Sequence, residues 1–216
     1  MKRRLEWPSC ANVRDLGGHR AGARESKWRA VVRADNLNRL TEGGRASLVA
    51  YGVRTVIDLR DPRELERFPY PFGPSDLPNV IVRNVPLISV AEWEAIKDPE
   101  RMREGYVLTA KLSLPNIVSA LNAIAEAPPG AVVVHCHEGR ERTGIVVALL
   151  LAIAGVDDES IGADWVLSEP GTMEPAWIID VLQHMRRERG SVEQYLEVGG
   201  LTAAAVDALR SRLFSS

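Results

Sequence analysis

The sequence Ala131-Val-Val-Val-His-Cys-His-Glu-Gly-Arg-Glu-Arg-Thr-Gly144 decides the fold. Residues 131–135 form a β-branched run, which is typical of a strand that is buried on both faces of a sheet. A helix over residues 143–154 would carry apolar side chains on nearly every face, which predicts that this helix is buried. A strand, a polar turn and a helix in this order place the turn at the carboxyl end of a parallel sheet, where open α/β folds bind ligands.

Other segments supply further strands and helices for this sheet. Residues 53–59 predict a second buried strand, whereas residues 28–33 and 80–85 are weaker strand candidates. Residues 69–78 are expected to form a loop. Helices are predicted at residues 40–51, just after Asp61, and at residues 115–127, 143–154, 158–167, 175–189 and 202–214. We therefore expect a single α/β domain over residues 1–216, with a central, mainly parallel sheet flanked by helices.

The composition restricts the class of protein. Apolar residues make up 45% and charged residues 26%, and the formal net charge of −2 argues against a non-specific binder of nucleic acid or membrane surfaces. The first eight residues lack the apolar run of a secretory signal, and the longest apolar stretch is too short to span a bilayer. We expect a cytoplasmic protein without nucleic-acid partners or integral membrane association. Cys10 and Cys136 could form at most one disulfide, and the chemistry below needs a free thiol.

The turn between the buried strand and the buried helix carries the side chains for nucleophilic catalysis on phosphate. Cys136 lies where backbone amides and a helix N-terminus stabilise a thiolate. Arg142 can return across the turn, and its planar guanidinium suits two phosphoryl oxygens. Thr143 can donate its hydroxyl to the cysteine sulfur, and His135 is better placed to order the turn from beneath than to act as a base. This chemistry requires no metal and no cofactor.

The same turn can wrap its backbone around one phosphate as an amide nest. The expected phosphate-binding residues are His137, Glu138, Gly139, Arg140, Glu141 and Arg142. An inert buried cysteine at a strand end is the alternative interpretation of Cys136. That alternative does not explain two arginines and a glycine within the same few residues.

The motif His135-Cys136-x5-Arg142-Thr143-Gly144 resembles the signature of the protein tyrosine phosphatase superfamily. Three further stretches resemble its bacterial tyrosine phosphatase branch, which includes a mycobacterial enzyme; they cover residues 12–18, 52–60 and 190–196. The similarity runs from about Trp7 to Phe214. It implies a central sheet flanked by helices and hydrolysis of a phosphomonoester through a phosphocysteine intermediate.

The turn departs from the pattern of that branch, which usually reads Gly-Lys-Asp-Arg-Thr-Gly. Arg140 keeps the positive charge that binds substrate in related enzymes, but a guanidinium is not equivalent to an ammonium. Glu141 replaces an aspartate, and the second family position for an acid falls near Ser89, where this chain has no aspartate. We therefore expect Glu141 to be the general acid. The alternative is that Glu141 pairs with a neighbouring arginine.

Further polar residues border the predicted site. Asp58 and Arg60 close the strand beside the catalytic one, so they point toward the same rim or form a structural ion-pair network. Asp164 resembles a family position near the pocket, and a surface ion pair is the equally favoured alternative. Residues 92–112 are a candidate lid.

These features favour an enzyme that acts on phosphotyrosine, and also on phosphoserine or phosphothreonine. Its partner is a phosphorylated protein or a small phosphoester, and phosphate is the product. A phosphoinositide or inositol phosphatase with the same mechanism is the first alternative, although Glu138 and Glu141 cancel the two arginine charges of the turn and weaken it. A rhodanese-type sulfurtransferase and a non-catalytic phosphate-binding module are minor alternatives.

Overall fold

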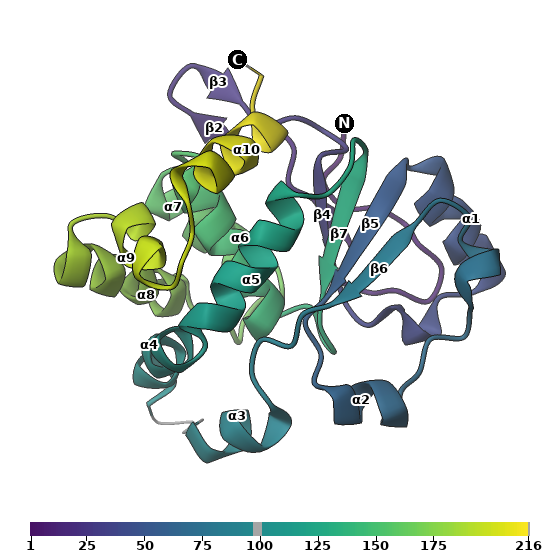
Figure 1. Ribbon diagram of the computed structural model, residues 1–216, viewed down its shortest axis with the longest axis horizontal. Helices are drawn as coiled ribbons and strands as arrows, with labels where there is room; N and C mark the ends of the chain where they lie inside the picture. The colour runs from purple at the N-terminus through teal and green to yellow at the C-terminus, as the bar shows by residue number, and fades with distance from the viewer. Residues whose placement is uncertain (97–100, 216) are drawn as a thin grey trace.

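A five-stranded sheet lies at the centre of the computed structural model, which describes residues 1–96 and 101–215 (Figure 1). The strand order is β1-β4-β7-β5-β6, and every neighbouring pair is parallel except β1 and β4. The strands are β1 (Arg14–Asp15), β4 (Val31–Ala34), β5 (Val53–Asp58), β6 (Ile81–Asn84) and β7 (Ala131–His135). A separate hairpin pairs β2 (Arg20–Ala21) with β3 (Arg24–Glu25). The predicted mainly parallel sheet is confirmed.

Ten helices surround this sheet in the described part of the chain. They are α1 (Glu42–Ala50), α2 (Pro62–Arg67), α3 (Val90–Ile96), α4 (Met102–Leu112), α5 (Leu114–Ala125), α6 (Glu141–Ile153), α7 (Asp158–Val166), α8 (Pro175–Arg189), α9 (Val192–Val198) and α10 (Ala203–Leu213). Each predicted helix is present, with its ends within about three residues of the expected ones. Helices α3, α4 and α9 and the short strands β1, β2 and β3 were not predicted; α3 and α4 lie largely within the segment that was named only as a candidate lid. The strand expected at residues 28–33 lies at residues 31–34, and the expected loop at residues 69–78 contains one 3-10 turn, Pro74–Asp76.

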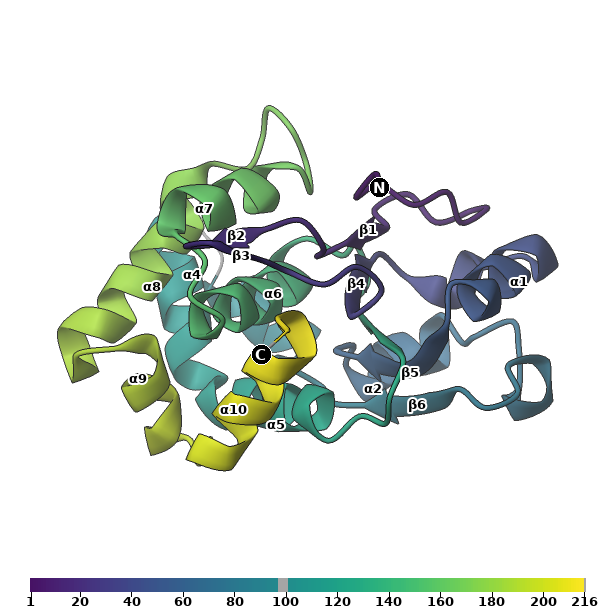
Figure 2. The ribbon, with the colours of Figure 1, turned by 90° about the horizontal axis from the view of Figure 1, so that it is seen from above.

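The side chains of the sheet divide between two hydrophobic clusters. On β7, Val132 and Val134 belong to the larger cluster, whereas Ala131 and Val133 belong to the smaller one, as the alternation of a strand requires. Helices α4 to α10 lie on the side of the larger cluster, and α1 lies on the other side (Figures 1 and 2). The β-branched run is continuous because both faces of this strand are covered.

Helix α6 begins directly after the polar turn and is buried along its length. All its residues from Thr143 to Leu151 are buried, which agrees with the apolar sequence on every side of the helix. Gly144 permits this packing, because a Cβ atom at that position would lie 2.5 Å from the Trp165 ring. The turn is therefore attached to an element that cannot shift without disturbing the core.

The parallel strands end at a common edge. In register, Ala34 and Asp58 are the partners of His135, and Asn84 is the partner of Asp58. The residues that follow these positions must emerge side by side at this edge. Helices α2 and α3 lie at the same end of the sheet (Figure 1).

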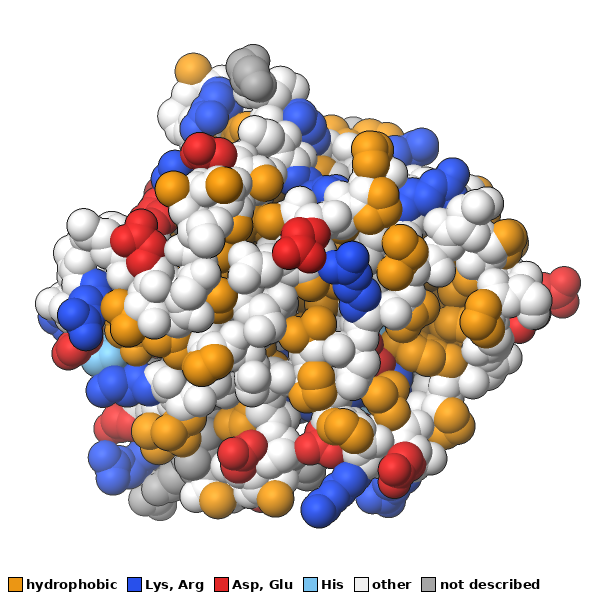
Figure 3. Space-filling model, in the orientation of Figure 1, with side chains coloured by type: hydrophobic (Ala, Val, Ile, Leu, Met, Phe, Trp, Pro, Cys, Tyr) orange, Lys and Arg blue, Asp and Glu red, His pale blue; other side chains and the backbone are white. Residues whose placement is uncertain are grey.

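The surface carries charges of both signs. On the face seen in Figure 3, acidic and basic side chains are interspersed rather than gathered in a patch of one sign. No single described helix has both the length and the apolar composition needed to cross a membrane. Helices α4 and α5 meet that test only together, as a pair bent by 71°.

Candidate active site

The turn between β7 and α6 brings the Cys136 sulfur under a backbone amide. Gly139 N donates to Cys136 Sγ over 3.3 Å, and α6 directs its N-terminus at the same region. Within the described part of the chain, the amides of His137, Glu138 and Arg140 donate to no protein acceptor. Only 1% of the Cys136 surface is exposed, but this residue lines a cavity of about 400 Å3. The arrangement can bind a small anion directly above the sulfur.

Close contact with β4 fixes the shape of the turn. Gly139 has a φ of +68°, and a Cβ atom there would lie 2.4 Å from the carbonyl oxygen of Ala34. Its own carbonyl accepts from Arg33 Nη2 at 2.8 Å and from Asn12 Nδ2 at 3.2 Å. Only glycine fits this position, and two side chains from distant segments hold it there.

Arg142 is held by a carboxylate from α2. Its Nη1 and Nη2 atoms donate to the two carboxylate oxygens of Glu64 at 2.5 and 2.9 Å. Burial opposes the charge of Glu64, but its bonds to Arg142 outweigh this effect and lower the pKa of Glu64. In the sequence, Glu64 is recognisable only as the residue three positions after the capping Asp61. In the structure its carboxylate accepts a hydrogen bond from Asp61 N. Its position after the strand neighbouring β7 was the available signal, but Glu64 was not predicted as a site residue.

The second arginine of the turn is surrounded by acids. Arg140 makes ion pairs with Glu138, Glu169 and, at 3.6 Å, Glu141. Burial raises the pKa of Glu141 above its ordinary value, although the charge of Arg140 acts in the opposite direction. Glu141 lines the same cavity as Cys136. Glu141 thus has a raised pKa and lines the cavity, and it is also an ion-pair partner of Arg140, so its role as the general acid stays a prediction.

A largely buried polar network lies beneath the turn. His135 Nδ1 donates to the Cys136 carbonyl at 3.0 Å, and its Nε2 atom lies 2.8 Å from the Tyr70 hydroxyl. The Tyr70 hydroxyl donates its proton to Asp58 at 2.6 Å, and Asp58 forms a bidentate ion pair with Arg60. Burial lowers the pKa of His135. Neither Asp58 nor Arg60 lines the cavity, so the structure places them below the rim rather than on it. Tyr70 was not predicted as a member.

Asp164 belongs to a second buried network, and the surface ion pair considered for it is wrong. The residue is 2% exposed, and its Oδ2 atom accepts from Arg33 Nη1 at 2.6 Å. Arg33 also reaches Ser168 at 2.7 Å and the Gly139 carbonyl. The sequence of α7 alone could not show that Asp164 is buried, because its burial depends on how α7 packs against β4. The network connects α7 and β4 to the turn.

Two predicted features differ from the geometry. The expected bond between the Thr143 hydroxyl and the Cys136 sulfur is not formed; the Thr143 hydroxyl is buried without a partner among the described residues. Cys10 and Cys136 are both free thiols and belong to different hydrophobic clusters. Burial and, to a smaller extent, Asp35 raise the pKa of Cys10 to about 12. Cys10 is therefore a thiol, not a thiolate, at neutral pH.

The remaining predicted residues lie around the mouth of the cavity. His137 is half-buried beside Phe68, and its ring lies 3.2 Å from the Asn36 amide. Glu138 is exposed. The segment predicted as a lid contributes Trp93, Glu94 and Met102 to the cavity wall. Its residues 97–100 lie outside the described part of the chain.

Comparisons with known proteins agree with this geometry. A family model described as "Tyrosine phosphatase family" matches residues 5–215. A tyrosine-protein phosphatase of Nostoc commune is 33% identical over 143 residues, which cover 64% of this chain and 48% of that protein. The triple specificity protein phosphatase PtpB of Mycobacterium tuberculosis is 28% identical over 195 residues, which cover 76% of this chain and 68% of that protein. The chain spans about half the length of the first relative and about two thirds of the second.

A solved structure shows the same fold. The Siw14 catalytic core covers 87% of this chain and 96% of its own, with a TM-score of 0.51 and 12% identity. At that identity the likeness concerns the fold alone. The predicted α/β fold and the resemblance to tyrosine phosphatases are both confirmed.

The ion pair between Glu64 and Arg142 leads to a prediction about positioning. In Glu64→Gln, Arg142 loses its charged partner and is less well placed for a phosphoryl group. We expect kcat/KM for an aryl phosphate to fall about tenfold, which corresponds to ~1.4 kcal/mol. The matched control is Glu66→Gln on the exposed side of α2, which should keep the wild-type kcat/KM. Wild-type kinetics in Glu64→Gln, with an unchanged thermal unfolding curve, would contradict this role.

Proposed function

The chain belongs to the tyrosine phosphatase family, and from this membership we propose that it hydrolyses phosphotyrosine monoesters through a phosphocysteine intermediate on Cys136. Phosphoserine and phosphothreonine are secondary substrates in this proposal. One observation carries it: the Cys136 sulfur accepts a hydrogen bond from the Gly139 amide at the base of a cavity that Arg142 also lines. A cysteine sulfur, backbone amides without a protein acceptor and a guanidinium thus border one cavity, which supports the proposal.

In the first step, the Cys136 thiolate attacks phosphorus. The S–P bond forms as the P–O bond to the tyrosine oxygen breaks, and the phenolate that leaves takes a proton from the Glu141 carboxyl. A phenolate is a poor leaving group with a pKa of about 10, so this proton lowers the barrier. The raised pKa of Glu141, which burial causes, keeps its carboxyl protonated over a wider pH range.

In the second step, water attacks the phosphorus of phosphocysteine. The Glu141 carboxylate accepts a proton from the water as the new P–O bond forms and the S–P bond breaks. Inorganic phosphate and the Cys136 thiolate are the products. The Thr143 hydroxyl has no partner in the described structure, so it is free to turn toward the sulfur and donate to the departing thiolate.

Electrostatic stabilisation comes from Arg142 and the amides of the turn. The charge that spreads over the phosphoryl oxygens meets donors that are already in place. Arg142 makes its two bonds to Glu64 through Nη1 and Nη2, which leaves Nε and one further N–H on each terminal nitrogen for substrate. Neither charge of the pair has to be moved for phosphate to bind.

The charges of the turn favour a singly phosphorylated group over a polyphosphate. Arg140 is paired with three carboxylates, so it adds little free positive charge to the cavity. An inositol polyphosphate would need more unpaired cations near its several phosphates. The relatives' names, a tyrosine-protein phosphatase and a triple specificity protein phosphatase, also support a protein substrate.

We further propose that residues 1–216 act as one catalytic unit in a reducing compartment such as the cytoplasm. The two hydrophobic clusters are the two faces of one sheet, which supports a single domain. A thiol nucleophile must stay reduced to act, and both cysteines are free.

The decisive variants exchange the two cysteines. With a phosphotyrosine peptide, Cys136→Ser should lower kcat by at least about a thousandfold, because a serine hydroxyl is not ionised at neutral pH. Cys10→Ser is the matched control and should keep the wild-type rate. Phosphoserine peptide and phosphoinositide, assayed in parallel, should be hydrolysed more slowly than the phosphotyrosine peptide. Undiminished hydrolysis by Cys136→Ser would refute the mechanism, and faster phosphoinositide turnover would refute the substrate.

The role of Glu141 predicts a specific pH dependence. As a general acid with a raised pKa, Glu141 loses its proton as pH increases through that pKa, so kcat of the wild type should decline there. In Glu141→Gln this decline should disappear, and kcat for a substrate with a poor leaving group should be lower by about a hundredfold. An activated aryl phosphate should be affected much less.

A control separates catalysis from ion pairing. Glu169→Gln also removes one carboxylate from Arg140, but Glu169 is not among the residues that line the cavity. It should retain the pH profile of the wild type. If the two variants behave alike, Glu141 acts only as a partner of Arg140.

A further inference from the structure

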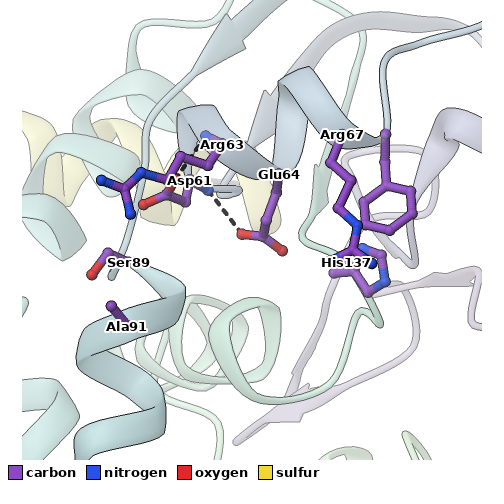
Figure 4. A pocket seen from close by; sticks show the side chains of 8 residues that line it. Asp61, Arg63, Glu64, Arg67, Ser89, Ala91 and His137 are labelled. Carbon is purple, nitrogen blue, oxygen red and sulfur yellow. Dashed lines mark hydrogen bonds between the residues drawn. The ribbon is translucent and has the colours of Figure 1, made fainter.

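A second and larger cavity lies beside the active site. Its volume is about 650 Å3, and it shares Glu64 and His137 with the wall of the cavity above Cys136. We call it the α2 pocket; it is lined by Asp61, Arg63, Arg67, Phe68, Ser89 and Ala91 in addition to the shared residues. Figure 4 shows Glu64 between the two arginines of α2: Arg63 lies at the end of the pocket where Ser89 and Ala91 are, and Arg67 lies at the other end beside His137. A substrate held at Cys136 therefore has an adjoining space.

The charges of the α2 pocket differ from those of the active site. Arg60, Arg140 and Arg142 are each paired with at least one carboxylate. Arg63 and Arg67 are exposed and have no carboxylate partner within the described part of the chain. They are four residues apart on α2, so they lie on one side of the helix. Two unpaired guanidinium groups thus border a pocket next to the reacting phosphate.

The rest of the lining is not suited to a polyanion. Phe68 and Ala91 are apolar, and the Arg67 guanidinium lies over the Phe68 ring, 5.2 Å from its centroid. Asp61 adds a negative charge to the same wall. The aliphatic stems of both arginines also present carbon atoms to the pocket. The fitting occupant has one negative group on a short hydrocarbon chain, which describes an aspartate or glutamate side chain.

We propose that the α2 pocket is a specificity subsite that binds an acidic side chain near the phosphorylated residue of a peptide substrate. The proposal rests on the proposed function, because it requires a phosphopeptide at Cys136. Arg63 and Arg67 bind the carboxylate, and Phe68 contacts the methylene groups. An extended peptide advances about 3.4 Å per residue, so a pocket that shares a wall with the active site takes a residue one to three positions away.

The test compares peptides that differ in one charge. A set of phosphotyrosine peptides carries aspartate or asparagine at each of the three positions on either side of the phosphotyrosine. For the wild type, kcat/KM at one or more positions should favour aspartate by about fivefold or more, as two partly exposed ion pairs allow. This preference should fall as ionic strength increases.

Variants assign the preference to the two arginines. In the double variant Arg63→Gln with Arg67→Gln, the ratio of kcat/KM for aspartate and asparagine peptides should fall to about one. Arg20→Gln is the matched control, an exposed arginine on β2 that should keep the wild-type ratio. In a second variant, Arg63→Glu, a new peptide preference should appear, so this test does not rely on the loss of a preference. This variant should favour lysine over aspartate at the same position.

The possible outcomes are distinct. If the wild type hydrolyses the peptides with a ratio near one at every position, the subsite is refuted and the proposed function stands. If the wild type hydrolyses no phosphotyrosine substrate, both proposals fail. If the arginine variants lower turnover of a phosphoinositide while peptide ratios do not change, the pocket serves a second phosphate and the assignment to an acidic side chain is wrong.

Discussion

In the proposed mechanism the Cys136 sulfur, which is 1% exposed, has to carry a negative charge inside the protein, and the surrounding structure has to stabilise that charge. Removing a charge from water is costly unless donors replace the water, and here the donor is the Gly139 amide at 3.3 Å, with the N-terminus of α6 behind it. That amide can point at the sulfur only because Gly139 adopts a positive φ against the Ala34 carbonyl. Arg33 then holds the Gly139 carbonyl from the opposite side.

Buried positive charges near the turn likewise need partners that replace water. Three buried or half-buried arginines near the turn have a carboxylate at hydrogen-bond distance: Arg33 has Asp164, Arg60 has Asp58 and Arg142 has Glu64. These pairs contribute little net stability, because desolvation offsets their attraction, but they fix where each guanidinium lies. Precise placement of charged groups lowers the barrier of phosphoryl transfer. Arg63 and Arg67, which have no carboxylate partner among the described residues, border the α2 pocket.

The sequence predicted whatever depends on local pattern. The β-branched run, the apolar helix and the turn with its cysteine and arginine are contiguous, so the fold class, which is confirmed, and the candidate site could both be predicted from them. Glu64, Tyr70 and Arg33 were not predicted, because they reach the site only through the parallel register that aligns β4, β5 and β7. Asp164 was misjudged for a similar reason, since a helix of mixed composition does not reveal which side faces a buried arginine. The Thr143 hydroxyl shows that a correct motif does not fix a hydrogen bond.

The most direct test is to trap the covalent intermediate. Wild-type protein is mixed with a phosphotyrosine peptide, quenched in acid within milliseconds and digested, and the fragments are examined by mass spectrometry. The account predicts a phosphoryl group on the fragment that contains Cys136, present in nearly stoichiometric amount early in the reaction and absent after the substrate is consumed. Phosphate release without any adduct on that fragment, or an adduct on a different residue, would contradict it.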